Sequence, residues 1–441
     1  MMQTILESEA PFASRERSPR ESPNRHQSPP PPPPLTVFFS QSLVPTQPRN
    51  EMNPRPAATL ETASAAATAT QHRGGVPEEI IIWEILPRLP VRALLHCRAV
   101  CRSWRRALTF KSNSDFLLAH HRLQPSLPIA SCVQLARHDL RAVAPHATAL
   151  SPVATLRHPS LQLRASCDGL LILSLSQVNF YICNPSTRQW VLQPFFPHFL
   201  GFYPHRPSGE YRILYGTGPP KNPRSGHKAS YSVLTVGSGK GRSIGRPAAS
   251  ASQEKALGEG IVNTAPDRPS VLLREGLHFY PVKKQKSSNM VMVFSTTTES
   301  FRWLSAPAVP ASATLFEMDG KLRLSSISDD VMSVDICMLQ DYDNEVWELK
   351  YRVKLPVVEM SLSAARRNFA SVVVSEEGGV LVSNFSRLVH ADIEGKLLSD
   401  FQYPEQSLLI VPYKLKESLL RHAFFPCRRD EEANASLSPF M

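Results

Sequence analysis

The chain lacks long uninterrupted apolar runs. Nowhere in its 441 residues does such a run approach the roughly 18 residues that a helix needs to cross a bilayer, so we expect no membrane span. Near the N-terminus, glutamates stand among the arginines and no apolar segment has the character of a signal peptide. The sequence therefore predicts a protein of the cytoplasm or nucleus.

The common motifs of catalytic sites are also missing. There is no glycine-rich phosphate loop, no nucleophile elbow and no helical pair of metal-binding histidines. The histidines, such as His138, His158 and His227, have no acids paired with them at informative spacing, which favours solvated or capping roles. We therefore expect no catalytic residue, no cofactor, no metal and no enzymatic activity.

Cysteine is scarce and irregularly placed. The seven cysteines are odd in number and widely scattered, which favours reduced thiols over a disulfide framework. A zinc site built from Cys97, Cys101, His120 and His121 is an alternative. The four-residue spacing of the two cysteines within a helical apolar stripe is better explained by packing.

The first 75 residues contain little that could form a core. They include six consecutive prolines at Pro29–Pro34, three Ser-Pro pairs and an Ala/Thr-rich stretch from Ala57 to Thr70. Such a segment cannot bury enough apolar surface to offset the entropy of ordering, so residues 1–75 are predicted to be a disordered leader. A polyproline ligand or a phosphorylated tail is the functional alternative, and Leu35–Phe39 is a candidate docking segment.

Residues 76–108 carry the densest pattern in the chain. Pro77-Glu78-Glu79 suits a first helical turn, because the acids complement the positive end of the helix dipole. Pro90 ends an apolar stripe at helical spacing that is formed by Ile81, Ile82, Ile85, Leu86 and Leu89. Two further amphipathic helices are predicted before Leu108. So small a bundle has little core of its own, and part of its apolar surface should meet another domain or a partner.

This stretch resembles the F-box, particularly its plant form. Val76–Glu79 matches the Leu-Pro-acidic-acidic opening, Glu84–Val91 contains the Glu-Ile-Leu and Arg-Leu-Pro-Val of the centre, and Arg98–Arg105 matches Arg-x-Val-Cys-x-Ser-Trp-Arg. Val76 replaces the family's leucine, and Pro87 should bend or shorten the first helix. The resemblance implies that this module binds a Skp-type adaptor and, through it, a cullin scaffold.

The predicted adaptor contacts are apolar residues of this module. Each of them could serve the interface or the internal core, and the sequence leaves both roles open. They are Pro77, Ile81, Ile85, Leu86, Leu89, Pro90, Val91, Leu95, Val100 and Trp104.

From about Leu161 the pattern changes to short β runs separated by turns. One unit consists of apolar strands, a polar turn and an aromatic strand before proline, and it comprises Cys167–Leu175, Phe180–Cys183 and Trp190–Leu192. The order recurs at residues 278–307 and 321–356, and more loosely at 231–245 and 379–393. Units of about 40 to 60 residues with several strands each predict propeller blades, whose aromatic residues Trp190, Trp303 and Trp347 should pack blade against blade.

This region resembles the plant F-box-associated domain, which is kelch-like. The residues that carry the likeness are Cys167–Pro194, Phe316–Ser326 and Asp343–Pro356, while residues 204–252 depart most and put a second blade in doubt. The expected fold class is an α+β multidomain protein, a small three-helix F-box followed by a mostly β, propeller-like domain. The expected divisions are 76–122 for the F-box and the following helix, 123–160 for a linker, 161–425 for the propeller and 426–441 for a flexible tail.

Together the two resemblances imply a substrate-recognition subunit of an SCF-type cullin-RING ubiquitin ligase, with the β domain binding a target protein whose identity the sequence does not give. One alternative is a non-degradative interaction scaffold. Another is nucleic-acid binding, since 49 Lys plus Arg against 38 Asp plus Glu leave a net charge of +11. The basic stretches lack a groove-reading module, which argues against nucleic acid as a partner.

Overall fold

A computed structural model describes residues 37–38 and 76–426, with gaps at 110–113, 135–136, 145–149, 157–160, 176–177, 218–229, 246–267, 281–289, 308–312, 329–332, 356–369, 375–378, 385–386 and 403–406. The predicted leader, apart from residues 37–38, and the predicted tail beyond residue 426 lie outside the described residues.

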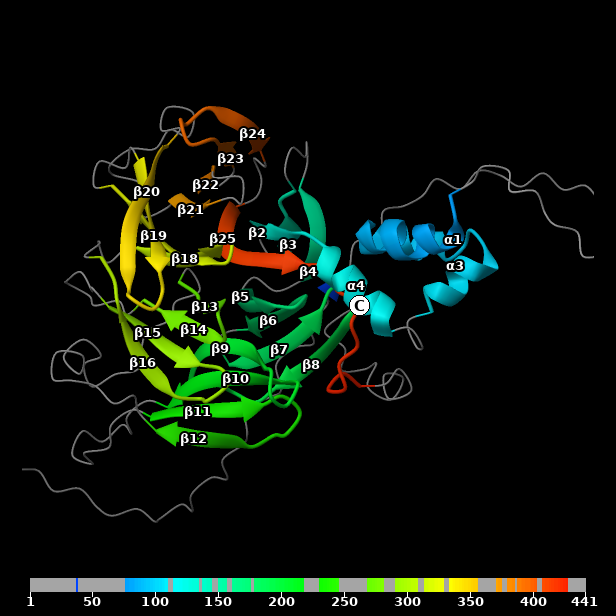
Figure 1. Ribbon diagram of the computed structural model, residues 1–441, viewed down its shortest axis with the longest axis horizontal. Helices are drawn as coiled ribbons and strands as arrows, with labels where there is room; N and C mark the ends of the chain where they lie inside the picture. The colour runs from blue at the N-terminus through cyan, green and yellow to red at the C-terminus, as the bar shows by residue number, and fades with distance from the viewer. Residues whose placement is uncertain are drawn as a thin grey trace, which may run out of the picture. The chain divides into compact units, whose positions relative to one another are not determined.

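The helices of the described residues lie within 78–123, where the F-box pattern lies (Figure 1). They are α1 (Glu78–Ile80), the π-helix η1 (Ile81–Ile85), the 3-10 turn η2 (Leu86–Arg88), α2 (Val91–Cys97), α3 (Arg102–Ala107) and α4 (Ser114–Leu123). The first predicted helix is therefore one segment that changes type before Pro87. Proline has no amide proton, so Pro87 cannot donate the backbone hydrogen bond of an α-helix. One residue earlier, the Leu86 amide donates to the Ile81 carbonyl, which is the spacing of a π-helix.

Five sheets of the described residues each contain four strands that are consecutive in sequence and pair antiparallel. The first comprises β5 (Leu161–Cys167), β6 (Leu170–Leu175), β7 (Asn179–Asn184) and β8 (Gln189–Gln193). The second comprises β9 (His198–His205), β10 (Glu210–Thr217), β11 (Ser230–Thr235) and β12 (Gly241–Gly245). The third comprises β13 (Val271–Leu273), β14 (Gly276–Phe279), β15 (Met290–Ser295) and β16 (Phe301–Ser305). The fourth comprises β17 (Thr314–Met318), β18 (Lys321–Ile327), β19 (Ser333–Asp341) and β20 (Val346–Lys354). The fifth comprises β21 (Ala370–Val374), β22 (Val380–Asn384), β23 (Arg387–Ala391) and β24 (Leu397–Gln402).

The sixth sheet joins the two ends of the β domain. Its order is β1 (Val37–Phe38), β4 (Ser151–Leu156), β3 (Arg137–Ala142), β2 (Ser126–Gln134) and β25 (Ser407–Lys416). The prediction of a linker at 123–160 was therefore wrong, because three strands lie there. Of these strands, β2 pairs with β25, which is almost 300 residues away in sequence, and short-range patterns do not reveal such a pairing.

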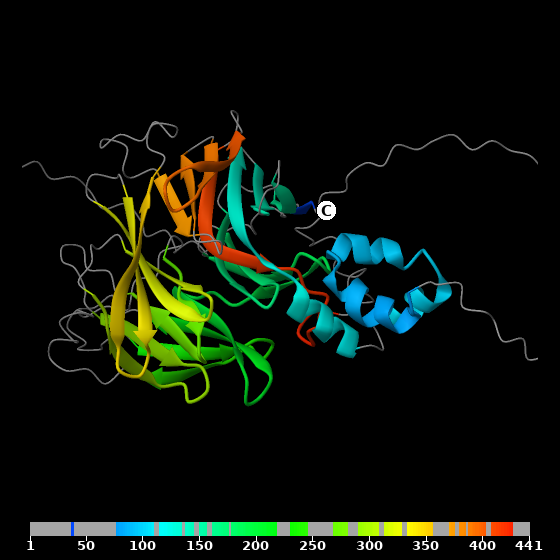
Figure 2. The same ribbon diagram turned by 45° about the horizontal axis from the view of Figure 1, so that its top comes forward.

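Six sheets in this connectivity form a six-bladed propeller, and Figures 1 and 2 let the blades be followed in chain order from β5 to β24. The blade placed in doubt by residues 204–252 is present as β9–β12. Tight hairpins begin several blades. The Asp-Gly pairs 168–169 and 319–320 have positive φ at both residues, as a type I′ turn requires.

The propeller has several apolar cores, which lie between neighbouring blades. One cluster combines Tyr203 and Tyr231 of the second blade with Phe279 and Phe294 of the third. The tryptophans follow the predicted packing role. Trp190, Trp303 and Trp347 each lie on the fourth strand of a blade and pack against the cluster shared with the preceding blade.

Candidate functional site

The N-terminal helices hold the residues predicted to contact a partner, and local chemistry sets their ends. The Pro77 carbonyl accepts a hydrogen bond from the Ile81 amide at 3.2 Å, and Glu78 and Glu79 occupy the first turn. Cys101 caps α3, since its Sγ accepts from the Trp104 amide at 3.4 Å. Among the described residues, no group of three or more His, Cys, Asp or Glu side chains is placed to hold a metal ion.

These helices share one apolar core. Leu94, Leu108 and Phe116 are fully buried at its centre. Leu419, which follows β25, is 3% exposed and completes the same core. The full set of buried residues is Leu86, Val91, Leu94, Leu108, Phe116, Leu117 and Leu419.

The structure sorts the ten predicted contact residues into three groups. Leu86 and Val91 are 1% and 5% exposed and belong to the core, so they support the bundle from within. Another group lies partly buried against that core and consists of Ile81, Leu89 and Trp104. The remaining five present surface to solvent and are Pro77, Ile85, Pro90, Leu95 and Val100.

At the start of the helical region, three further exposed apolar residues were not predicted. Val76, Ile80 and Trp83 are 56%, 45% and 44% exposed. They recur at i, i+4 and i+7, which is itself a helical stripe on a face other than that of Ile81 and Leu86. The spacing of this second stripe is present in the sequence, but the longer apolar stripe from Ile81 to Leu89 dominates the pattern there.

The chain after β25 runs back to the helices, and we call residues 417–425 the C-terminal segment (Figure 2). Glu417 Oε2 accepts a hydrogen bond from the Val91 amide at 2.8 Å. This matters because Pro90 precedes α2 and offers no side-chain cap, so a free amide at the helix start gains an anionic partner.

The same segment is also tied to the propeller. The Asn184 Nδ2 donates to the Ser418 carbonyl at 3.0 Å, and the Ser418 amide donates to Ser186 Oγ at 3.3 Å. Phe424 and Phe425 pack on the cluster between the first two blades. One short segment therefore belongs to both the helical core and the blade surface.

Two buried histidines and one partly buried histidine make stability depend on pH. Burial lowers the pKa of His138, His278 and His422 to about 4. His138 lies 2.5 Å from Ser131 Oγ, and Tyr342 Oη lies 2.6 Å from His278 Nε2. Each histidine stays neutral in the folded chain at a pH where the unfolded chain, with a pKa near 6.5, already binds a proton.

We therefore expect the free energy of unfolding to fall as pH drops from about 6.5 to 4, by up to about 1.4 kcal/mol per pH unit for each histidine. Urea unfolding at constant ionic strength measures this slope. His278→Gln should make the slope shallower, whereas the substitution His198→Gln at an exposed position should leave it unchanged. An identical slope in His278→Gln would contradict the assignment.

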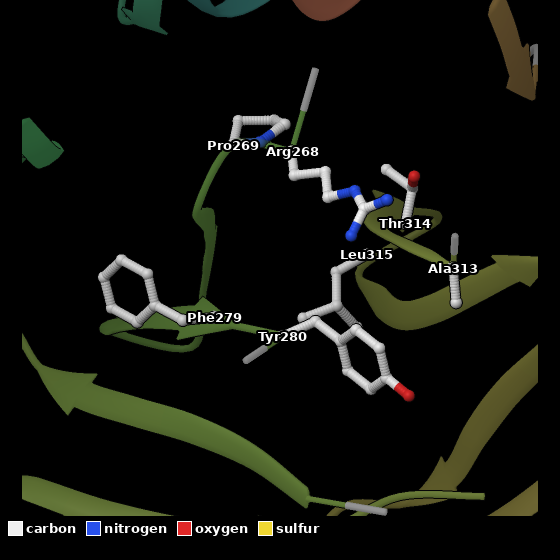
Figure 3. Close-up of a pocket in the computed structure, with 7 residues that line it drawn as sticks. All are labelled: Arg268, Pro269, Phe279, Tyr280, Ala313, Thr314 and Leu315. Atoms are coloured by element: carbon white, nitrogen blue, oxygen red, sulfur yellow. The ribbon is translucent and has the colours of Figure 1, made fainter. Parts of the chain in front are cut away.

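A small pocket lies where β14 meets β17 (Figure 3). Its volume of about 10 Å³ suffices for roughly one water molecule, so it is too small for a ligand. It is lined by Arg268, Pro269, Phe279, Tyr280, Ala313, Thr314 and Leu315.

None of the described helices has the length and apolar character of a membrane span.

Comparison with known proteins gives two family matches, F-box-like at residues 75–111 and F-box associated beta propeller domain at residues 133–392.

Two Arabidopsis thaliana proteins are similar in sequence. The putative F-box protein At3g52320 is 24% identical over 314 residues, which cover 65% of this chain and 75% of that protein. F-box protein At5g49610 is 32% identical over 119 residues, covering 26% of this chain and 31% of that protein. Among solved structures, TolB from Acinetobacter baumannii matches with a TM-score of 0.39 and 12% identity over 67% of this chain and 69% of its own. The chain belongs to the family of plant F-box proteins with an F-box-associated β-propeller domain, and it is a protein of the F-box substrate-receptor type.

Proposed function

We propose that this protein is the non-catalytic substrate-recognition subunit of an SCF-type cullin-RING ubiquitin ligase, acting in the cytoplasm or nucleus. The observation that carries the proposal is the exposed apolar surface of a helical bundle that matches the F-box model. Exposed apolar side chains on a small bundle are typical of a protein interface. The Skp-type adaptor would bind this surface and link the chain to a cullin.

The exposed members of the predicted set are the proposed direct contacts, together with the stripe of Val76, Ile80 and Trp83. Leu86 and Val91 would act indirectly by holding the helices in place. Glu417 would contribute in the same way, since it caps α2 through the Val91 amide.

The target protein is proposed to bind the propeller edge remote from the C-terminal segment. In the five blades of consecutive strands the first and third turns share one edge. In the first blade this edge carries Asn184 and Ser186, which contact Ser418. The strand ends at the opposite edge are separated by the longest intervals in sequence, including the end of β12 from the start of β13 and the end of β20 from the start of β21. Long connections on a rigid scaffold commonly carry recognition.

Function would follow from effective concentration. A target held beside the ubiquitin-loading machinery meets it as a quasi-intramolecular partner, so the propeller need not supply an acid, a base or a nucleophile.

We expect the double substitution Leu95→Glu, Val100→Glu to weaken adaptor binding by at least ten-fold, because it places charge on two exposed apolar positions that are 40% and 64% accessible. Calorimetric titration of the full chain with a purified Skp-type adaptor measures this. The matched control is Leu192→Glu, Val346→Glu, which changes equally exposed apolar positions on propeller strands.

Both variants should keep the circular dichroism spectrum of the parent protein. No binding by the folded parent protein would refute the ligase proposal. An equal loss of affinity in the control variant would show that the adaptor does not bind specifically to the F-box surface.

A further inference from the structure

The first strands of the blades, together with β25, surround a cavity of about 400 Å³. This volume lies in the range of roughly 300 to 1,000 Å³ that is typical of sites for small molecules. Several lining residues carry charge, namely Arg164, Asp168, Glu317, Lys414 and Lys416.

Arg164 lines this cavity at an irregularity of the backbone. In the pairing of β5 with β6, the register shifts between Leu163 and Ala165, so Arg164 is the extra residue of a β-bulge. The facing strand β25 has its own shift, which leaves Pro412 and Tyr413 unpaired with β2. The two irregularities meet, because the Tyr413 hydroxyl donates to the Arg164 carbonyl at 2.8 Å. Bulges of this kind redirect side chains and are frequent beside functional sites.

The guanidinium of Arg164 has few polar contacts among the described residues. Within the part of the chain that the structure describes, no carboxylate lies at ion-pair distance, and the buried Nε has no hydrogen-bond partner. Its polar contact is a long one, from Nη1 to Gln162 Oε1 at 3.4 Å, and its Cζ lies 5.8 Å from the Phe199 ring centroid. Burial penalises the charged form and lowers the pKa of this guanidinium.

The two carboxylates of the cavity are engaged elsewhere. Asp168 accepts a hydrogen bond from the Tyr211 hydroxyl at 3.0 Å and lies 3.8 Å from His121. Glu317 Oε1 accepts from the Gly320 amide at 2.8 Å. Lys414 adds a second cation that crosses to β17, where its Nζ lies 3.4 Å from the Glu317 carbonyl oxygen.

The Arg164 side chain is partly buried. A charge that is withdrawn from water is costly unless it is paired, and arginine pairs most strongly with the two oxygens of a carboxylate or phosphate. We propose that the central cavity of the propeller binds a small anion with carboxylate or phosphate groups, held by Arg164 and assisted by Lys414. None of the charged cavity residues belongs to the proposed adaptor surface.

Calorimetric and thermal-shift titrations of the purified full chain with sodium citrate and with inorganic phosphate test the proposal, against sodium chloride at matched ionic strength. We expect saturable one-to-one binding of at least one probe, weakened ten-fold or more by Arg164→Gln. Arg206→Gln removes an arginine whose side chain is 74% exposed and should leave the affinity unchanged.

Saturation by phosphate alone would assign a phosphate-bearing ligand, and saturation by citrate alone a carboxylate-bearing one. Should Arg164→Gln fail to fold, Lys414→Gln is the second variant and should weaken binding several-fold. Absence of saturation beyond the chloride control, or unchanged affinity in both cavity variants, would overturn the proposal.

Discussion

Deletion of residues 407–441 is expected to unfold the propeller and also to destabilise the N-terminal helices. The deletion removes β25, which pairs with β2 on both sides of a register shift and contributes Leu408, Ile410 and Leu415 to clusters shared with other blades. It also removes Leu419 from the helical core. Loss of several buried leucines, at about 2 to 5 kcal/mol each, exceeds the stability of most domains.

Circular dichroism, thermal unfolding and limited proteolysis of the truncated chain measure this effect. The matched control is deletion of 427–441 alone, which leaves β25 and the C-terminal segment in place and should preserve cooperative unfolding. If the longer deletion still gave a cooperative transition near that of the full chain, blade closure by β25 would not be a main source of stability.

The second large effect is expected for Gly169→Ala. Gly169 has a φ of +82°, and a Cβ at this position would lie 2.3 Å from Ser418 Cβ and 2.7 Å from the Lys416 carbonyl oxygen. The substitution therefore adds overlap with another backbone to the strain of a left-handed conformation. We expect a loss of roughly 2 to 5 kcal/mol in the free energy of unfolding.

A good comparison is Gly209→Ala, because Gly209 has a φ of +71° and open space around the added Cβ. Only the backbone strain of about 1 to 2 kcal/mol applies there. Chemical denaturation of both variants separates the two contributions. Equal losses would mean that the contact of the 168–169 turn with the C-terminal segment carries no energy.

The sequence predicted features whose cause is local. The start of α1 follows from Pro77 and two acids, and the change of helix type follows from Pro87. The first blade was predictable because Asp168-Gly169 and Asn184-Pro185 mark its turns between apolar runs.

The features that could not be predicted from the sequence depend on contacts with residues far along the chain. Residues 126–156 carry no aromatic strand before proline, and their role as blade strands depends on β25. In the same way, the exposure of Leu95 and the burial of Leu94, which are neighbours in sequence, depend on how α4 and Leu419 cover α2. In the sequence, the cavity residue Arg164 has the pattern of an ordinary strand residue, because a β-bulge is visible only once the strands are paired.

The place of Leu419 has a consequence for synthesis. A ribosome releases residues 76–108 early, but the leucine that completes their core comes about 300 residues later, a delay of roughly 15 to 60 s at ordinary elongation rates. During that interval the nascent helices lack both the Leu419 side chain and the Glu417 cap on α2. Chains that stall or terminate early therefore carry an incomplete bundle, so the fold itself distinguishes finished molecules from fragments.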